Sequence, residues 1–264
     1  MRLAAGLLAP ALLTSSAAAA ERTGPVAPDW AFGAPSGEAA LAAISVASLA
    51  SFFLPQRRST WAADASRPVD LTYAWISDLT GATLGSFLVT GQAYAFEGGY
   101  LAREGVPEPS ARALRTSLID LEAVALSTGI SWGVKRFTGR CRPRAYRDGQ
   151  CSDLDADFDA FPSGHTTPVA AIAGVHLSLV ARTPGDVSLR VGAFAVAEAA
   201  TLVTMVLRVG AGAHSWEDVG AGWILGHVTG VALGYAHPMV DVGAPRSPGS
   251  PPPAPAMFSW SGRF

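Results

Sequence analysis

The sequence FPSGHTTPVA, residues 161–170, is the stretch from which the other parts of the chain can be placed. Pro162 and the small hydroxyl residue Ser163 precede an apolar segment that the sequence predicts as a helix over 166–181. The unpaired N–H groups and the positive dipole end of such a helix start form a binding site for an anion. His165 lies in the first turn, where its imidazole can pass a proton to whatever the anion is bonded to.

A basic cluster precedes this stretch, at the end of another apolar segment. It begins at Lys135 and ends with the pair Arg142-Pro143. Two converging cations suit a phosphate, because arginine offers a bidentate fork and lysine a point charge. Taken alone, the cluster also fits a basic helix end that interacts with its own dipole.

A third polar cluster follows the stretch. His214 and Asp218 are four positions apart, so they are neighbours on one helical face. A carboxylate in that position can hold the imidazole Nδ1–H and leave Nε2 free to attack. Arg208, just before a glycine-rich turn, supplies a further cation. Taken alone, the pair also fits a capping histidine beside a surface carboxylate.

Composition limits the class of protein. A chain of 264 residues is long enough for one domain with a core, and a net charge of −2 gives no sign of nucleic-acid binding. Residues 1–20 have a charged start, a short apolar core and a small-residue end, which predicts a signal peptide and export to the periplasm or cell envelope. Export makes Cys141 and Cys151 a predicted disulfide.

Six apolar segments rich in Ala, Leu, Val and Gly predict an all-α fold, a six-helix antiparallel bundle. The segments are 37–54, 70–96, 111–138, 164–181, 187–208 and 216–236. Alternating helix directions bring the three polar clusters to one end of the bundle, which predicts a single composite site there. The domain is expected over 37–240, between an irregular lead-in over 21–36 and a proline-rich tail over 241–264.

Together, the motifs K-x6-R-P, P-S-G-H and R-x5-H-x3-D resemble the signature of the type 2 phosphatidic acid phosphatase and vanadium-dependent haloperoxidase superfamily. The resemblance covers residues 135–226. One position departs from the usual pattern, because Leu207 stands where the family usually has a serine before its arginine.

The resemblance implies a role for each motif residue. His214 is expected to be the nucleophile that forms a phosphohistidine, with Asp218 as the partner that orients it. His165 is expected to protonate the leaving alcohol. The residues expected to bind the phosphate are Lys135, Arg142, Ser163, Gly164 and Arg208.

The resulting expectation is an exported phosphatase that needs no metal and no cofactor. Its partners are phosphorylated small molecules or lipids, as phosphomonoesters or pyrophosphates, with lipid phosphates such as phosphatidate preferred if the helices are membrane-embedded. One alternative is a haloperoxidase in which vanadate is the cofactor rather than an inhibitor. Another is a non-catalytic phosphate- or lipid-binding envelope protein. The charge distribution slightly favours a soluble or peripheral bundle, and an integral membrane form stays open.

Two further features are assigned structural roles. The alternating acids Asp153, Asp155, Asp157 and Asp159 lack the glycine and glutamate of an EF-hand, so a solvated acidic loop is predicted in place of a metal site. His176 is predicted to be a hydrogen-bonded core histidine.

Overall fold

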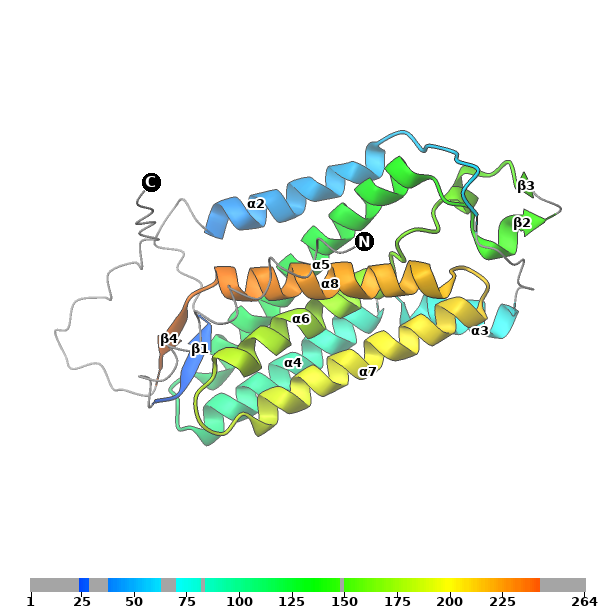
Figure 1. The fold of residues 1–264 in the computed structure, drawn as a ribbon. Coiled ribbons are helices and arrows are strands. Elements are labelled where there is room, and N and C mark those ends of the chain that lie inside the picture. Colours follow the sequence, from blue (N-terminus) through cyan, green and yellow to red (C-terminus); the bar gives the residue numbers. More distant parts are fainter. Residues whose placement is uncertain (1–23, 29–37, 63–69, 82–83, 148–149, 243–264) are drawn as a thin grey trace, which may run out of the picture.

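The computed structural model describes residues 24–28, 38–62, 70–81, 84–147 and 150–242, and these form an all-α fold, as predicted (Figure 1). The α-helices are α2 (Glu38–Ser48), α3 (Leu71–Thr80), α4 (Leu84–Arg103), α5 (Pro109–Thr138), α6 (Thr166–Arg182), α7 (Ser188–Gly210) and α8 (Trp216–Ala236). Short 3-10 helices are η1 (Leu49–Phe53), η2 (Pro143–Ala145) and η3 (Asp155–Phe158). The predicted signal peptide lies outside the described residues.

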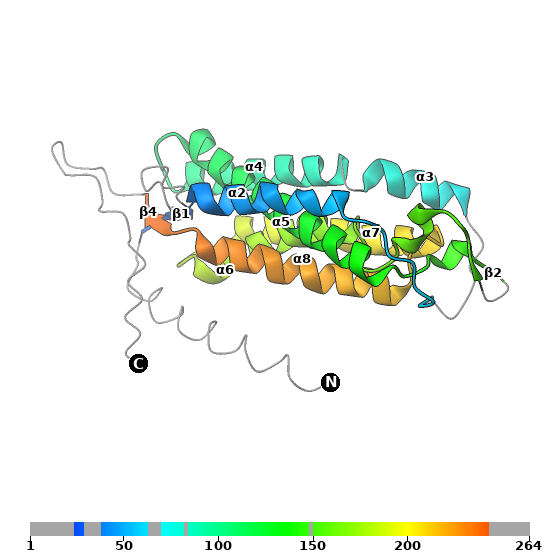
Figure 2. The same cartoon turned by 90° about the horizontal axis from the view of Figure 1, so that it is seen from above.

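Helix α6 is the centre of the bundle, and α5, α7 and α8 pack around it (Figures 1 and 2). Its side chains are buried along nearly the whole helix. Val169 and Ile172 pack with Ala197 of α7, and Ala171 and Val175 pack with residues of α5 and α8. Helix α6 is therefore held on several sides, which gives its N-terminal turn a rigid support.

The predicted count of six helices is wrong, because the segment 70–96 forms two helices, α3 and α4. Helix α3 ends at Gly81, whose backbone leaves the helical region with ψ −126°. A Cβ at this position would overlap the ring of His165. The close approach of two distant parts of the chain therefore requires a glycine here, and it is also where α3 ends.

The irregular lead-in predicted over 21–36 contains a strand in its described part. Strand β1 (Val26–Pro28) pairs antiparallel with β4 (Met239–Asp241), which follows α8, and Val26 lies opposite Asp241. Three residues with no alternation carry no strand signal in the sequence. The strand forms because the other end of the domain supplies its partner. The proline-rich tail from residue 243 lies outside the described residues.

The polar clusters meet at one end of the bundle. Helices α5 and α7 end there, whereas α6 and α8 begin there, and the β1–β4 pair lies at the other end (Figure 1). Helix α5 ends at Gly139, which has φ 58° and donates its N–H to the carbonyl of Lys135. This left-handed C-cap turns the chain sharply into the segment that carries Arg140 and Arg142.

Several ionisable side chains pair inside the bundle. His176, as predicted, is buried and hydrogen-bonded, with Nε2 3.2 Å from Asp120 Oδ2. Arg190 forms a buried ion pair with Glu97, and His237 Nε2 lies 2.9 Å from Glu122 Oε2. Each of these buried charges has a partner, as burial requires.

Two helices, α7 and α8, are long and apolar enough to cross a membrane, judged by length and composition among the described residues. Their outer faces expose large apolar side chains, including Leu202 and Val206 on α7 and Ile224 and Val228 on α8. These features are compatible with membrane association.

Candidate active site

The three polar clusters are joined by direct hydrogen bonds. The carbonyl of Asp159, just before the PSGH stretch, accepts from Lys135 Nζ at 2.5 Å. The N–H of Ser163 donates to the carbonyl of Asp218 at 2.9 Å. Arg140, between the two basic motif residues, donates from Nη1 to Asp218 Oδ1 at 2.8 Å. The structure thus brings together residues separated by long stretches of sequence.

His214 is buried and held in a defined tautomer. Its Nδ1 lies 2.8 Å from the carbonyl oxygen of Ala160. A carbonyl oxygen can only accept, so Nδ1 carries the hydrogen and Nε2 keeps its lone pair. Burial, followed by Arg142 and Lys135, holds the pKa of His214 well below its ordinary value. The ring is therefore a neutral imidazole with a free nucleophilic nitrogen.

Asp218 lies close to His214 but has other hydrogen-bond partners. Its Oδ2 accepts from the N–H of Ser215 at 2.7 Å in a capping box at the start of α8, and lies 3.9 Å from His214 Nδ1. Arg140 binds the other oxygen, Oδ1, and the 3.9 Å separation is too long for the carboxylate to hold the imidazole hydrogen directly. The direct bond expected from the His/Asp spacing is made by Ala160 instead, and Asp218 lies beside the ring without bonding to it.

Lys135 and Gly164 lie against one another at the start of α6. Lys135 is buried, and a Cβ on Gly164 would lie 3.1 Å from its Cε. Burial, together with Arg142, lowers the pKa of Lys135 to about 7. The side chain of Ser163 is also buried, and its Oγ accepts from the Thr166 hydroxyl at 3.1 Å. The backbone N–H of Ser163 therefore has a partner and its hydroxyl oxygen accepts from Thr166, which leaves the hydroxyl hydrogen to donate.

Arg142 is placed by the loop that follows it in sequence. Its Nε donates to the carbonyl of Ala156 at 2.9 Å, and its N–H donates to the carbonyl of Asp157 at 2.7 Å. Burial and the nearby Arg208 lower the pKa of Arg142 to about 10. A nearby arginine that lowers the pKa of Arg142 marks a region of concentrated positive charge, which favours a bound anion.

Arg208 completes the cationic group from α7. It is buried, and Nη1 donates to Ser77 Oγ at 3.0 Å and to Asp78 Oδ1 at 2.6 Å. Its Nε has no hydrogen-bond partner among the described residues. A buried guanidinium with an unused N–H has a donor left for a ligand.

His165 is the N-cap of α6 and the more accessible of the two motif histidines, with 27% of its side chain exposed. Its Nε2 lies 3.8 Å from Asp78 Oδ1. Burial and Arg208 lower the pKa of His165 to about 3, and Asp78 opposes this shift. The environment therefore favours the neutral ring until negative charge is added beside it.

Some site residues carry no usable signal in the sequence. Arg140 is as basic as its neighbours, so its inward position and its contact with Asp218 depend on the turn after Gly139. It also binds Glu217 Oε2 at 2.5 Å and lies over the ring of Trp61, 4.4 Å from the ring centre. The Ala160 carbonyl is a backbone group, which no residue pattern identifies.

The disulfide and the acidic loop support this end of the bundle. Cys141 and Cys151 are bonded to each other, which ties the motif segment to the loop. The prediction of a solvated loop is wrong for Asp159, which is buried, while Asp155 pairs with Arg58 at 2.8 Å. The described residues hold no group of three or more His, Cys, Asp or Glu side chains placed to bind a metal ion.

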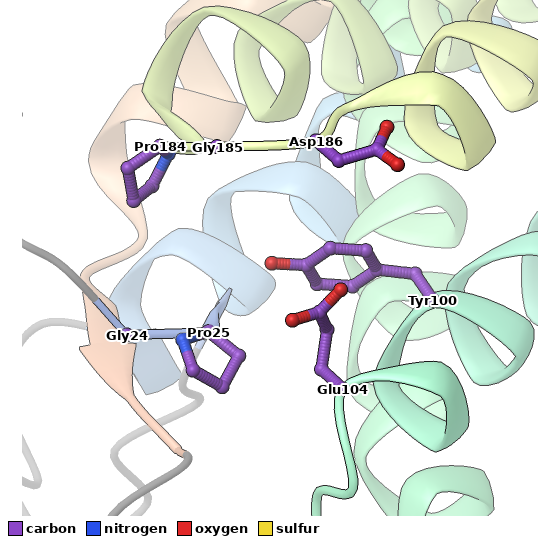
Figure 3. A pocket seen from close by; sticks show the side chains of 7 residues that line it. All are labelled: Gly24, Pro25, Tyr100, Glu104, Pro184, Gly185 and Asp186. Atoms are coloured by element: carbon purple, nitrogen blue, oxygen red, sulfur yellow. The ribbon is translucent and has the colours of Figure 1, made fainter.

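A pocket of about 300 Å³ opens at the opposite end of the bundle (Figure 3). Its lining includes Tyr100, Glu104 and Asp186. Arg103 already pairs with both carboxylates, at 3.4 Å from Glu104 and 3.3 Å from Asp186. The pocket therefore lacks the unpaired positive charge that a phosphate needs, and it is separate from the motif cluster.

Fold and site together define a class: an all-α protein with a cluster of buried cationic side chains and two histidines of different accessibility. Residues 117–240 match the family model described as the PAP2 superfamily. This match is consistent with a member of the superfamily and confirms the resemblance drawn from the motifs. No curated protein and no solved structure gives a significant match to the chain.

The match to the PAP2 superfamily model supports, in general terms, a phosphatase-type hydrolase that acts on phosphorylated substrates. Helix α3 and the 3-10 helix η1 lie outside the matched residues, although both contact the matched segment.

Proposed function

We propose that this protein is an exported, metal-independent phosphatase that hydrolyses phosphomonoesters or pyrophosphates through a phosphohistidine on His214. The observation that carries the proposal is the bond from His214 Nδ1 to the Ala160 carbonyl. Because this bond fixes the hydrogen on Nδ1, Nε2 keeps its lone pair beside the cations. A protein that only binds phosphate needs the cations but has no use for a fixed, neutral imidazole.

The first half of the reaction transfers the phosphoryl group to the enzyme. The Nε2 lone pair of His214 attacks phosphorus, the bond to the leaving oxygen breaks, and His165 gives that oxygen a proton. Lys135, Arg142 and Arg208 bind the equatorial oxygens and stabilise their charge. A bound phosphate dianion raises the pKa of His165 through its negative charge, so substrate binding itself promotes protonation of this acid.

The second half regenerates the enzyme. Neutral His165 takes a proton from water, the water oxygen attacks phosphorus, and the P–N bond to His214 breaks. Inorganic phosphate leaves, and His165 is protonated again for the next cycle. Positioning and fixed positive charge supply the catalysis in this scheme, which is the usual basis of phosphoryl transfer.

The proposed substrates are lipid phosphates such as phosphatidate. The support is the apolar outer surface of α7 and α8, which is compatible with membrane association and would keep the protein near lipid. Export to the periplasm or cell envelope follows from the predicted signal peptide over 1–20.

The test is phosphate release from the purified mature protein, with p-nitrophenyl phosphate and dispersed phosphatidate as substrates. We expect activity that survives EDTA and is blocked by micromolar vanadate. Phosphatidate should be the better substrate if lipid is recognised. Brief incubation with labelled substrate should leave an alkali-stable, acid-labile label on the protein, and His214→Ala should carry none.

Two results would favour the other interpretations. Halogenation of a phenolic dye after vanadate loading, with no phosphate release, would support a haloperoxidase. Phosphate binding without either activity would support a non-catalytic envelope protein. Release that requires a divalent metal would overturn the proposed mechanism.

A further inference from the structure

Helix α3 precedes the residues that match the family model and carries none of the motifs, yet its last turn lies on the motif residues. We propose that α3 completes the active site: Asp78 is a positioning residue that controls the protonation of His165 and, with Ser77, orients Arg208. This inference rests on the proposed function for the role of His165. The contacts that support it are present in the structure whatever reaction the site catalyses.

The geometry places one carboxylate oxygen between two motif residues. Asp78 Oδ1 lies 2.6 Å from Arg208 Nη1 and 3.8 Å from His165 Nε2. Gly81, at the end of the same helix, lies so close to the His165 ring that a Cβ would overlap it. Helix α3 also packs along α7, which carries Arg208. The carboxylate is thus held in place by the packing of its helix.

Ser77 supplies a hydroxyl to the same arginine nitrogen. Its Oγ accepts from Arg208 Nη1 at 3.0 Å, and the residue is buried. The position before Arg208 is Leu207, where the superfamily pattern usually has a serine. Ser77 therefore gives Arg208 a hydroxyl partner from a different helix. With Nη1 bound to α3, Nε has no partner among the described residues and is one of the donors that Arg208 keeps for phosphate.

Among the groups with the largest effect on His165, the other charges are positive. Arg208 of α7, Arg142 after α5 and Lys135 of α5 all lower its pKa, and Asp78 of α3 raises it. His214, the remaining titratable group that interacts with it, is held neutral. Among these groups, Asp78 is the one negative charge that favours the protonated ring.

A carboxylate in this position has two opposite consequences. It competes with phosphate for Arg208, so it weakens anion binding. It also favours the protonated form of His165, which the leaving oxygen needs. Removal of its charge should therefore strengthen phosphate binding and slow turnover, a combination that simple damage to the fold does not produce.

The test variant is Asp78→Asn, and the matched control is Asp70→Asn on the same helix. Asp70 accepts hydrogen bonds from the N–H groups of Thr72 and Tyr73 as the N-cap of α3. Asparagine caps a helix as well as aspartate does, so the control removes the same charge from the same helix and keeps the cap. Asp78 is 69% exposed, so its replacement by an isosteric amide should leave the fold intact.

For Asp78→Asn we expect inorganic phosphate to bind on the order of fivefold tighter, as loss of a repulsive charge near 4 Å in water implies. We expect kcat to fall about tenfold on the alkaline side, with the alkaline limb of the pH profile displaced by about one unit to lower pH. Asp70→Asn should match the wild type in phosphate affinity, in kcat and in the position of the alkaline limb. Weaker phosphate binding, or an unmoved alkaline limb, would overturn the inference.

An NMR titration, read beside the phosphatase assay, separates this inference from the proposed function. NMR titration of His165 in wild type and Asp78→Asn, with inorganic phosphate present, reads its pKa without any turnover. We expect the variant to show the lower pKa. If the wild type lacks phosphatase activity but the shift is seen, the proposed function fails and the charge coupling stands. Equal pKa values in an active enzyme would refute the role of Asp78.

Ser77→Ala isolates the second part of the inference. Because it removes a hydroxyl and no charge, we expect the KM to rise several-fold with the pH profile unchanged. Ser77→Thr, which keeps the hydroxyl, should restore part of the loss. Equal effects from both substitutions would point to packing rather than to the bond with Arg208.

Discussion

Replacement of Arg140 by methionine should destabilise the fold strongly, because it leaves the buried carboxylate of Asp218 without its cationic partner. Arg140 and Asp218 are 2% and 0% exposed, and the two side chains are joined at 2.8 Å. Removal of one partner of a buried ion pair costs about 3–5 kcal/mol. Methionine keeps much of the apolar contact with Trp61, so most of this loss belongs to Asp218.

The magnitude follows from where the lost contacts lie. Glu217, the other acidic partner of Arg140, is 69% exposed and can return to water at little cost. Asp218 Oδ2 keeps the N–H of Ser215, but Oδ1 loses its arginine. The estimate for Arg140→Met therefore stands near the middle of the range, about 4 kcal/mol.

The loss should also depend on pH. Burial raises the pKa of Asp218, whereas Ser215 and Arg140 oppose this, so loss of Arg140 raises it further. A raised carboxyl pKa in the folded state disfavours folding above the unfolded pKa and has no effect where both states are protonated. The destabilisation should therefore be largest near neutral pH, shrink as the pH falls through the raised folded-state pKa of Asp218, and vanish below about 4, the ordinary pKa of an aspartate.

The assay is urea unfolding of the purified protein at pH 7 and at acidic pH. Glu217→Gln is the control and should stay within about 1 kcal/mol of wild type. The double variant Arg140→Met/Asp218→Asn should lose less free energy of unfolding than the two single variants together, because it no longer buries the unpaired charge of Asp218. A loss for Arg140→Met no larger than that for Glu217→Gln would refute the reasoning.

Three further outcomes follow from the site. His214→Ala should abolish turnover, to below about one thousandth of the wild-type rate, while calorimetry still detects bound phosphate; normal turnover would exclude this nucleophile. Because burial and Arg142 lower the pKa of Lys135 to about 7, inhibition by sulfate, which stays dianionic, should weaken as the pH rises above that value. Lys135→Arg, charged at every accessible pH, should lose that dependence, and an unchanged profile would contradict it. Removal of the disulfide by Cys141→Ser with Cys151→Ser should cost about 2–3 kcal/mol in thermal unfolding because the closed loop is short; an unshifted midpoint would show that the loop is held by its other contacts.

Local signals identified most of the helices and where they end. The PSGH stretch marks the start of α6, and Gly139 marks the end of α5, because proline and glycine restrict the backbone wherever they occur. Helix lengths and alternation then brought the three clusters to one end. The break at Gly81 escaped prediction because its cause is the His165 ring, which is distant in the sequence.

The sequence did not predict which residues distant in the chain share a hydrogen bond. The His/Asp spacing predicted that Asp218 holds His214, and it correctly placed the two side chains near one another. Which oxygen receives the imidazole hydrogen depended on a difference of about an ångström between Ala160 at 2.8 Å and Asp218 at 3.9 Å. Differences of that size are set by packing, and no residue pattern resolves them.

Residue types and their spacing thus determined the all-α class, the three motifs and the charged and candidate nucleophilic groups, because these are local properties of the chain. Tertiary structure decided which groups share a hydrogen bond. It placed Arg140 on Asp218 and the Ala160 carbonyl on His214, and it put Asp78 of α3 beside Arg208. Charge and burial act through distance, and distances between remote residues exist only once the helices have packed.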